Sequence, residues 1–183
     1  MIYRSSLNLP NSITISRILA LPLCVYVLFI DGGNDPSWRI VAWGLFFIVG
    51  MTDLLDGNLA RSRNTVTEFG KLLDPIADKA LIGSALISLS LMGDLAWWVT
   101  IVILARELGI TIFRFSILKN GVIPANRGGK IKTTVQNFAA GFYILPLGES
   151  LYIFRDAFMV LAVVLTIGTG MWYLRDSFKG KRK

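Results

Sequence analysis

The sequence predicts an all-α integral membrane protein with six transmembrane helices and both termini in the cytoplasm. Its composition, its six apolar segments and the one-sided distribution of Lys and Arg lead to this fold class. Apolar residues make up 54% of the 183 residues and charged residues only 17%, whereas soluble chains contain about 25% charged residues. Together with a mean hydropathy of +0.59, this composition excludes a disordered chain and disfavours a soluble globular domain.

Six segments are long and apolar enough to cross a bilayer, which takes about 20 residues per helix. They are residues 11–30, 38–60, 70–92, 95–118, 131–148 and 153–175. The intervening breaks contain turn-forming residues, as in Asp31-Gly-Gly-Asn-Asp-Pro36, Met92-Gly-Asp94 and the polar loop Gly121–Gly129. Since no internal repeat or linker divides the chain, we expect residues 1–183 to form one transmembrane domain.

The basic residues predict the orientation of these spans. The loops at 31–37 and 93–94 contain no Lys or Arg, and only Arg39 and Arg155 lie near that side. The other side carries Arg4, Arg61, Arg63, Lys71, Lys119, Arg127, Lys130, Lys132 and the tail Lys179–Lys183. By the positive-inside rule, that side faces the cytoplasm of a multi-pass protein in the cell membrane.

Ionisable residues interrupt five of the six predicted spans, since only the last has 18 consecutive uncharged residues (157–174), and these interrupting residues fall in the cytoplasmic half. They are Arg17, Asp53, Asp56, Asp74, Asp78, Lys79, Arg106, Glu107, Arg114, Lys130 and Lys132. A charge in the middle of a membrane helix costs about 2.5–3.5 kcal/mol even on insertion scales. Their grouping therefore indicates one recessed polar cavity, open to the cytoplasm, rather than a channel through the full thickness.

The carboxylates have the spacing of a metal site. Asp53 and Asp56 are three residues apart, and Asp74 and Asp78 are four apart, so each pair shares one face of a helix. The chain has no His and one Cys, which excludes His- or Cys-based zinc sites. Oxygen ligands suit Mg²⁺, Mn²⁺ or Ca²⁺, and four carboxylates are enough for the two-metal sites that catalyse phosphoryl displacement.

Three of these interpretations have simpler alternatives. Residues 1–30 have the outline of a signal peptide, but no cleavage site follows and five more spans do. Asp74 precedes Pro75 and could be a plain N-cap. Arg106 and Glu107 could form a structural ion pair, because charges inside a membrane usually pair.

The spacing of these carboxylates also resembles a known family. The pattern Asp53-x2-Asp56-Gly57-x2-Ala60-Arg61-x8-Gly70-x3-Asp74-x3-Asp78 has eight fixed residues over 26 positions, and all eight match the signature of the CDP-alcohol phosphotransferases. In that family an alcohol attacks the β-phosphorus of a CDP-linked donor and releases CMP. The resemblance covers nearly the whole chain.

The resemblance implies roles for individual residues. Asp53, Asp56, Asp74 and Asp78 would hold two ions of Mg²⁺ or Mn²⁺, and Asp78 would also be the general base. The CDP-diacylglycerol contacts would be Asn11, Arg17, Gly57, Arg61 and Thr67. It also implies a homodimer and no nucleic-acid partner.

The acceptor is indicated by further motifs and by charge. Asn8-Leu-Pro-Asn-x2-Thr14, Ala105-Arg-Glu107 and Gly129-Lys-x-Lys-Thr-Thr134 resemble the phosphatidylglycerophosphate synthase branch, whose acceptor is sn-glycerol 3-phosphate. Its phosphate would be bound by Arg106, Arg114, Lys130 and Lys132. Inositol phosphate, phosphatidylglycerol or serine as acceptor are alternatives within the family. A divalent-cation carrier is the alternative from another class, and it predicts metal flux without CMP release.

Overall fold

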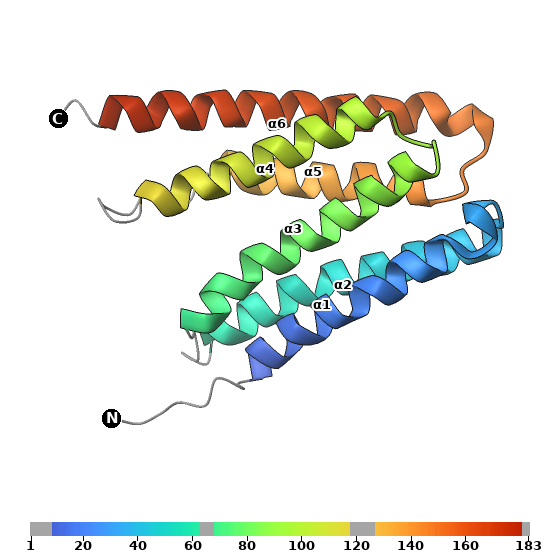
Figure 1. Cartoon of the computed structure of the whole chain (residues 1–183), viewed down its shortest axis with the longest axis horizontal. Helices are drawn as coiled ribbons and strands as arrows, with labels where there is room; N and C mark the ends of the chain where they lie inside the picture. Colours follow the sequence, from blue (N-terminus) through green and yellow to red (C-terminus); the bar gives the residue numbers. More distant parts are fainter. Residues whose placement is uncertain (1–8, 63–67, 118–126, 181–183) are drawn as a thin grey trace.

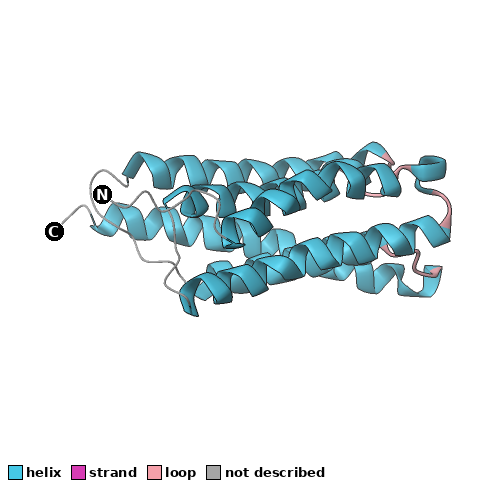
Figure 2. Ribbon diagram, turned by 90° about the horizontal axis from the view of Figure 1, so that it is seen from below, coloured by secondary structure: helices cyan, strands magenta, loops and turns pink. Residues whose placement is uncertain are grey.

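The protein is a bundle of six long α-helices in a computed structural model that describes residues 9–62, 68–117 and 127–180 (Figure 1). In chain order the elements are α1 (Leu9–Leu28), η1 (Ile30–Gly33), α2 (Pro36–Ser62), α3 (Glu68–Leu91), α4 (Trp97–Ile117), α5 (Arg127–Ile144), η3 (Glu149–Leu151) and α6 (Tyr152–Gly180). No strand occurs in these described ranges (Figure 2). The helices alternate in direction, so α1 begins and α6 ends at the same end of the bundle (Figure 1).

Each of the six predicted segments coincides with one helix, which confirms the all-α class. One alternative interpretation and one predicted boundary are wrong. The helix that contains Asp74 begins at Glu68, which excludes the alternative that Asp74 is an N-cap. Helix α5 covers Arg127–Ile144 instead of 131–148. It ends before Pro146 because proline has no N–H and disfavours helical geometry in the residue before it.

The ends of two helices show how local sequence sets the boundaries. Before α2, the Asp35 carboxylate accepts the backbone N–H of Ser37 at 2.7 Å, and Pro36 takes the first helical position, where no N–H is needed. After α3, Gly93 has a φ of +83°. The N–H groups of Gly93 and Asp94 bond to the carbonyls of Ser90 and Leu89, which is the Schellman arrangement that ends a helix.

Apolar side chains fill the interior and also cover much of the exterior. Leu28, Leu86, Leu89 and Ile103 are at most 1% exposed, whereas Ile153 on α6 is 84% exposed. By length and composition, one helical segment in the described part of the chain, Glu149–Tyr173, could cross a membrane. The crossing of a bilayer by all six helices stays a prediction.

Arg39 of α2 joins three parts of the bundle at the end away from the chain termini. Its Nη2 donates to Asp94 Oδ2 at 2.6 Å and to the Tyr143 carbonyl at 2.7 Å. Its Nε donates to the Ile144 carbonyl at 3.0 Å, and its Nη1 to the Gly33 carbonyl at 3.1 Å. One guanidinium thus satisfies the last carbonyls of α5, which have no partner within their own helix, and ties α5 to the turns at η1 and after α3.

We expect Arg39→Gln to lower the free energy of unfolding by about 3 kcal/mol or more, because it removes a charged hub and leaves Asp94 and three carbonyls without their donor. Unfolding in detergent micelles measures the change. Arg175→Gln, which removes the same charge from an exposed site, is the matched control and should change stability by less than about 0.5 kcal/mol. Equal stabilities of the two variants would contradict a structural role for Arg39.

Candidate active site

The predicted site residues lie on the helix ends that meet at the end of the bundle where α1 begins. Positions 53, 56, 57 and 61 are in the last turns of α2, and positions 74 and 78 are in the first turns of α3. Both of these helix ends lie at the left of Figure 1. The backbone therefore brings the two halves of the predicted carboxylate motif to one end of the fold.

Several predicted site residues lie outside what the structure describes. Thr67 is outside the described residues, and for the others only the helical backbone is described. The residues of which only the helical backbone is described are Asn11, Asp53, Asp56, Gly57, Arg61, Asp74, Arg114 and Lys130. Among the side chains that are described, no three His, Cys, Asp or Glu residues lie close enough to hold a metal ion. The role of the four Asp residues stays a prediction.

Asp78 is paired with Arg17 of α1. Arg17 Nη1 lies 3.1 Å from Asp78 Oδ1, and the Arg17 side chain is 1% exposed whereas that of Asp78 is 44% exposed. The structure therefore brings together a predicted donor-binding residue and the predicted base, with the carboxylate still open to its surroundings.

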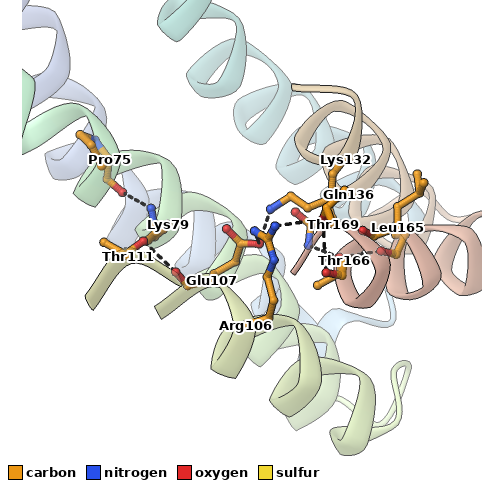
Figure 3. A network of polar contacts seen from close by, with 11 residues as sticks. Pro75, Lys79, Arg106, Glu107, Thr111, Lys132, Gln136, Leu165, Thr166 and Thr169 are labelled. Carbon is orange, nitrogen blue, oxygen red and sulfur yellow. Dashed lines mark hydrogen bonds and ion pairs between the residues drawn. The ribbon is translucent and has the colours of Figure 1, made fainter. Parts of the chain in front are cut away.

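A second ionic cluster joins α4 and α5 (Figure 3). Glu107 Oε1 accepts a hydrogen bond from Arg106 Nη1 at 3.0 Å and a second one from Lys132 Nζ. The side chains of Glu107 and Lys132 are only 13% and 3% exposed. The structure thus confirms the Arg106–Glu107 pair and adds Lys132 to it.

Arg106 is in turn fixed to α6. Its Nη2 donates to Thr169 Oγ1 at 2.9 Å. A Cβ atom on Gly170 would lie 3.3 Å from Arg106 Cγ and 3.4 Å from Nε, so the arginine packs directly on the glycine backbone. This geometry favours a structural role for Arg106, as a link between α4 and α6.

One helical turn deeper, Gln136 extends the polar layer. Its Nε2 donates to Thr166 Oγ1 at 2.9 Å, and Thr166 donates to the Ala162 carbonyl at 2.6 Å. Beyond this layer the facing residues of α5 and α6 are buried and apolar, among them Ala139, Ala140 and Met159. This apolar stretch separates the polar layer at the site end from a second polar contact of α5 and α6 at the far end, where the Tyr143 hydroxyl donates to Asp156 Oδ1 at 2.7 Å.

The two ionic clusters lie on neighbouring helices. Helix α3, which carries Asp78, packs against both α4 and α5. Lys79, the residue after Asp78, lies close enough to Lys132 for their positive charges to repel each other. A base candidate and a buried cation thus lie near each other at the site end of the bundle.

Sequence reasoning did not include Glu107, Lys79 or Thr169 among the site residues. A signal for Glu107 was present, since a carboxylate inside an apolar segment needs a partner. Its bond to Lys132, 25 positions along the chain, depends on how α4 and α5 pack. No feature of the sequence distinguishes Thr169 from the other hydroxyl residues of α6.

The chemistry available here is anion binding next to a carboxylate site. An ammonium has three donors, so Lys132 can keep Glu107 and also hold a phosphate oxygen. The converging positions on α2 and α3 supply only oxygen donors, which fit a hard divalent cation. Bound there, such cations would stabilise the charge that develops when a diphosphate is cleaved.

Comparison with known proteins identifies the family. The family model described as CDP-alcohol phosphatidyltransferase matches residues 7–168. The chain is 48% identical over 172 residues to a probable phosphatidylglycerophosphate synthase of Mycobacterium tuberculosis, covering 94% of this chain and 82% of that protein. It is 38% and 35% identical to proteins of Rickettsia bellii and Bacillus subtilis, each named CDP-diacylglycerol–glycerol-3-phosphate 3-phosphatidyltransferase. These matches cover 92% and 94% of this chain and 94% and 96% of the two relatives. The resemblance of the motif is thereby confirmed, and the chain is an enzyme of the CDP-alcohol phosphatidyltransferase family.

Proposed function

We propose that this enzyme transfers the phosphatidyl group from CDP-diacylglycerol to sn-glycerol 3-phosphate, giving phosphatidylglycerol phosphate and CMP. The observation that carries the choice of acceptor is the Lys132 ammonium, which is 2% exposed as a whole residue and lies close to Lys79, the residue after Asp78. A buried cation next to the carboxylate motif suits an acceptor that brings its own phosphate. The names of the three relatives agree with this acceptor.

In the proposed reaction, the acceptor hydroxyl oxygen forms a bond to the β-phosphorus of the donor. The bond between that phosphorus and the oxygen bridging to CMP breaks, and CMP leaves with the electron pair. Asp78 takes the hydroxyl proton. Asp53, Asp56, Asp74 and Asp78 would hold two divalent cations, Mg²⁺ or Mn²⁺.

We propose two groups of substrate contacts. Asn11, Gly57, Arg61 and Thr67 would bind the donor. Arg17 would act on the donor side as well, and its ion pair with Asp78 supports a role in orienting that carboxylate. Arg114, Lys130 and Lys132 would bind the acceptor phosphate, with Arg106 supporting them through Glu107.

We further propose one transmembrane domain over residues 1–183, with six spans and both termini in the cytoplasm of a multi-pass cell-membrane protein. The alternation of the six helices supports this topology (Figure 1), as do exposed apolar side chains on the outside of the bundle, such as Ile153. The site end of the bundle would then face the cytoplasm. Assembly as a homodimer is proposed from family membership.

A panel of acceptors tests the function. Purified enzyme in vesicles containing CDP-diacylglycerol should release CMP on addition of glycerol 3-phosphate. Inositol phosphate, serine and phosphatidylglycerol should give much lower rates, because none of them would place a phosphate at Lys132 and a hydroxyl at Asp78 at the same time. Faster CMP release with any of these three would reassign the acceptor, and metal flux without CMP release would support the carrier.

The metal requirement is tested by chelation and by substitution. EDTA should abolish CMP release, and Mg²⁺ or Mn²⁺ should restore it. Asp53→Asn, Asp56→Asn and Asp74→Asn should each lower activity by orders of magnitude, because each removes an ionised oxygen ligand but keeps the shape of the side chain. Wild-type turnover in the triple variant would show that these carboxylates are structural.

Cysteine labelling tests the topology. In intact cells, a membrane-impermeant maleimide should label Asn34→Cys but not Lys181→Cys, which should react only after the membrane has been permeabilised. The native Cys24 is buried, so it should contribute little background. Labelling of both introduced cysteines from the same side would refute the proposed six-span arrangement.

A further inference from the structure

We propose that Glu107 is a positioning residue for the acceptor: its carboxylate, held by Arg106, orients the Lys132 ammonium to bind the acceptor phosphate. This inference rests on the proposed function. It assigns to Glu107 a role that differs from substrate binding, because the residue acts through its neighbour on α5. Figure 3 shows the side chains concerned.

A series of contacts leads from α6 through Arg106 and Glu107 to Lys132. Thr169 of α6 holds Arg106 Nη2 at 2.9 Å, Arg106 Nη1 holds Glu107 Oε1 at 3.0 Å, and the same oxygen accepts from Lys132 Nζ. The Arg106 side chain also packs directly on the Gly170 backbone. A flexible lysine on α5 is thus fixed by a chain of contacts that starts on a different helix.

Burial makes this arrangement necessary. The Lys132 side chain is only 3% exposed, and a buried ammonium without a partner would be strongly disfavoured. A lysine side chain also has many rotamers, and ordering them when a ligand binds costs free energy. Because Glu107 orders the ammonium before the acceptor binds, the free energy of binding does not include this ordering cost.

The charges of the cluster also match the proposed ligand. Lys79 of α3 lies close enough to Lys132 for their positive charges to repel each other, as does Arg106. Among the described side chains of this cluster, three cations face one carboxylate, which leaves two net positive charges. A phosphate monoester carries close to two negative charges at neutral pH, so it would neutralise the cluster.

A competing interpretation makes the opposite prediction. If Glu107 blocked the site by occupying Lys132, its removal would tighten acceptor binding and lower KM. If it positions Lys132, its removal should loosen acceptor binding and raise KM. The sign of the change in KM therefore separates the two interpretations.

The experiment measures CMP release against glycerol 3-phosphate concentration, with the enzyme in vesicles containing CDP-diacylglycerol. Glu107→Gln should raise KM for glycerol 3-phosphate by about 10- to 150-fold, the loss expected for one charge-assisted hydrogen bond. Both kcat and KM for the donor should stay within about 3-fold of wild type. Glu107→Asp should be intermediate. Glu149→Gln, which removes the same charge from an exposed position at the other end of the bundle, should behave as wild type.

Coupling to Lys132 is tested by a double-mutant cycle. If Glu107 acts through the lysine, Glu107→Gln/Lys132→Gln should have the same acceptor KM as Lys132→Gln alone. Multiplicative effects would overturn the proposal, as would a lowered KM in Glu107→Gln. Equal losses toward donor and acceptor, with a lowered unfolding temperature, would indicate a merely structural role and would also overturn it.

A variant that keeps every charge provides the safeguard against misfolding. Gly170→Ala should displace Arg106 and raise the acceptor KM several-fold. Because alanine has a higher helix propensity than glycine, this substitution should not unfold α6. Gly168→Ala is the matched control on the same helix, since no atom lies within 4 Å of the Cβ it would add. Identical acceptor KM values for the two variants would contradict the proposed chain of contacts. If wild-type enzyme showed no response to glycerol 3-phosphate, the proposed function itself would be wrong, and the role of Glu107 would fall with it.

Discussion

Ion pairs between different helices determine how this apolar bundle is assembled. In the described residues, Arg17 of α1 pairs with Asp78 of α3, and Lys132 of α5 pairs with Glu107 of α4. Arg39 of α2 pairs with Asp94 after α3. Because an isolated charge is costly in apolar surroundings, each helix can take only a position and rotation that keep its charge next to a partner. Apolar packing alone would allow many more arrangements.

These pairs divide the bundle into two functional groups of helices. Helices α1, α2 and α3 carry the carboxylate motif and the proposed donor contacts, with the Arg17–Asp78 pair among them. Helices α4, α5 and α6 carry the proposed acceptor cations and the contacts of Arg106. The two groups pack on each other where α3 meets α4 and α5, and the Arg39 hub joins them at the opposite end. The two substrates would thus be held by separate groups of helices.

The fold was largely predictable because long apolar segments, proline and glycine are local signals. They predicted six helices, and the misplaced end of α5 was signalled by Pro146. The carboxylate motif was equally visible, since its residues have fixed helical spacing. The bonds of Glu107 were not predictable in the same way. Its partners are the adjacent Arg106 and a lysine 25 positions away, and the second contact exists only after α4 and α5 have packed.

Stability alone does not explain why three charged residues are buried together at the interface of α4, α5 and α6. Desolvation offsets most of the attraction in a buried ion pair, and apolar side chains of similar size often stabilise such an interface equally well. Apolar replacements, however, could not bind an anion. The bonds of Arg106 to Glu107 and Thr169 fix its guanidinium between α4 and α6, and the Lys132 ammonium keeps donors for a ligand after meeting one carboxylate. The cluster is therefore better explained as a pre-ordered phosphate site, in which the arginine and the glutamate serve the lysine.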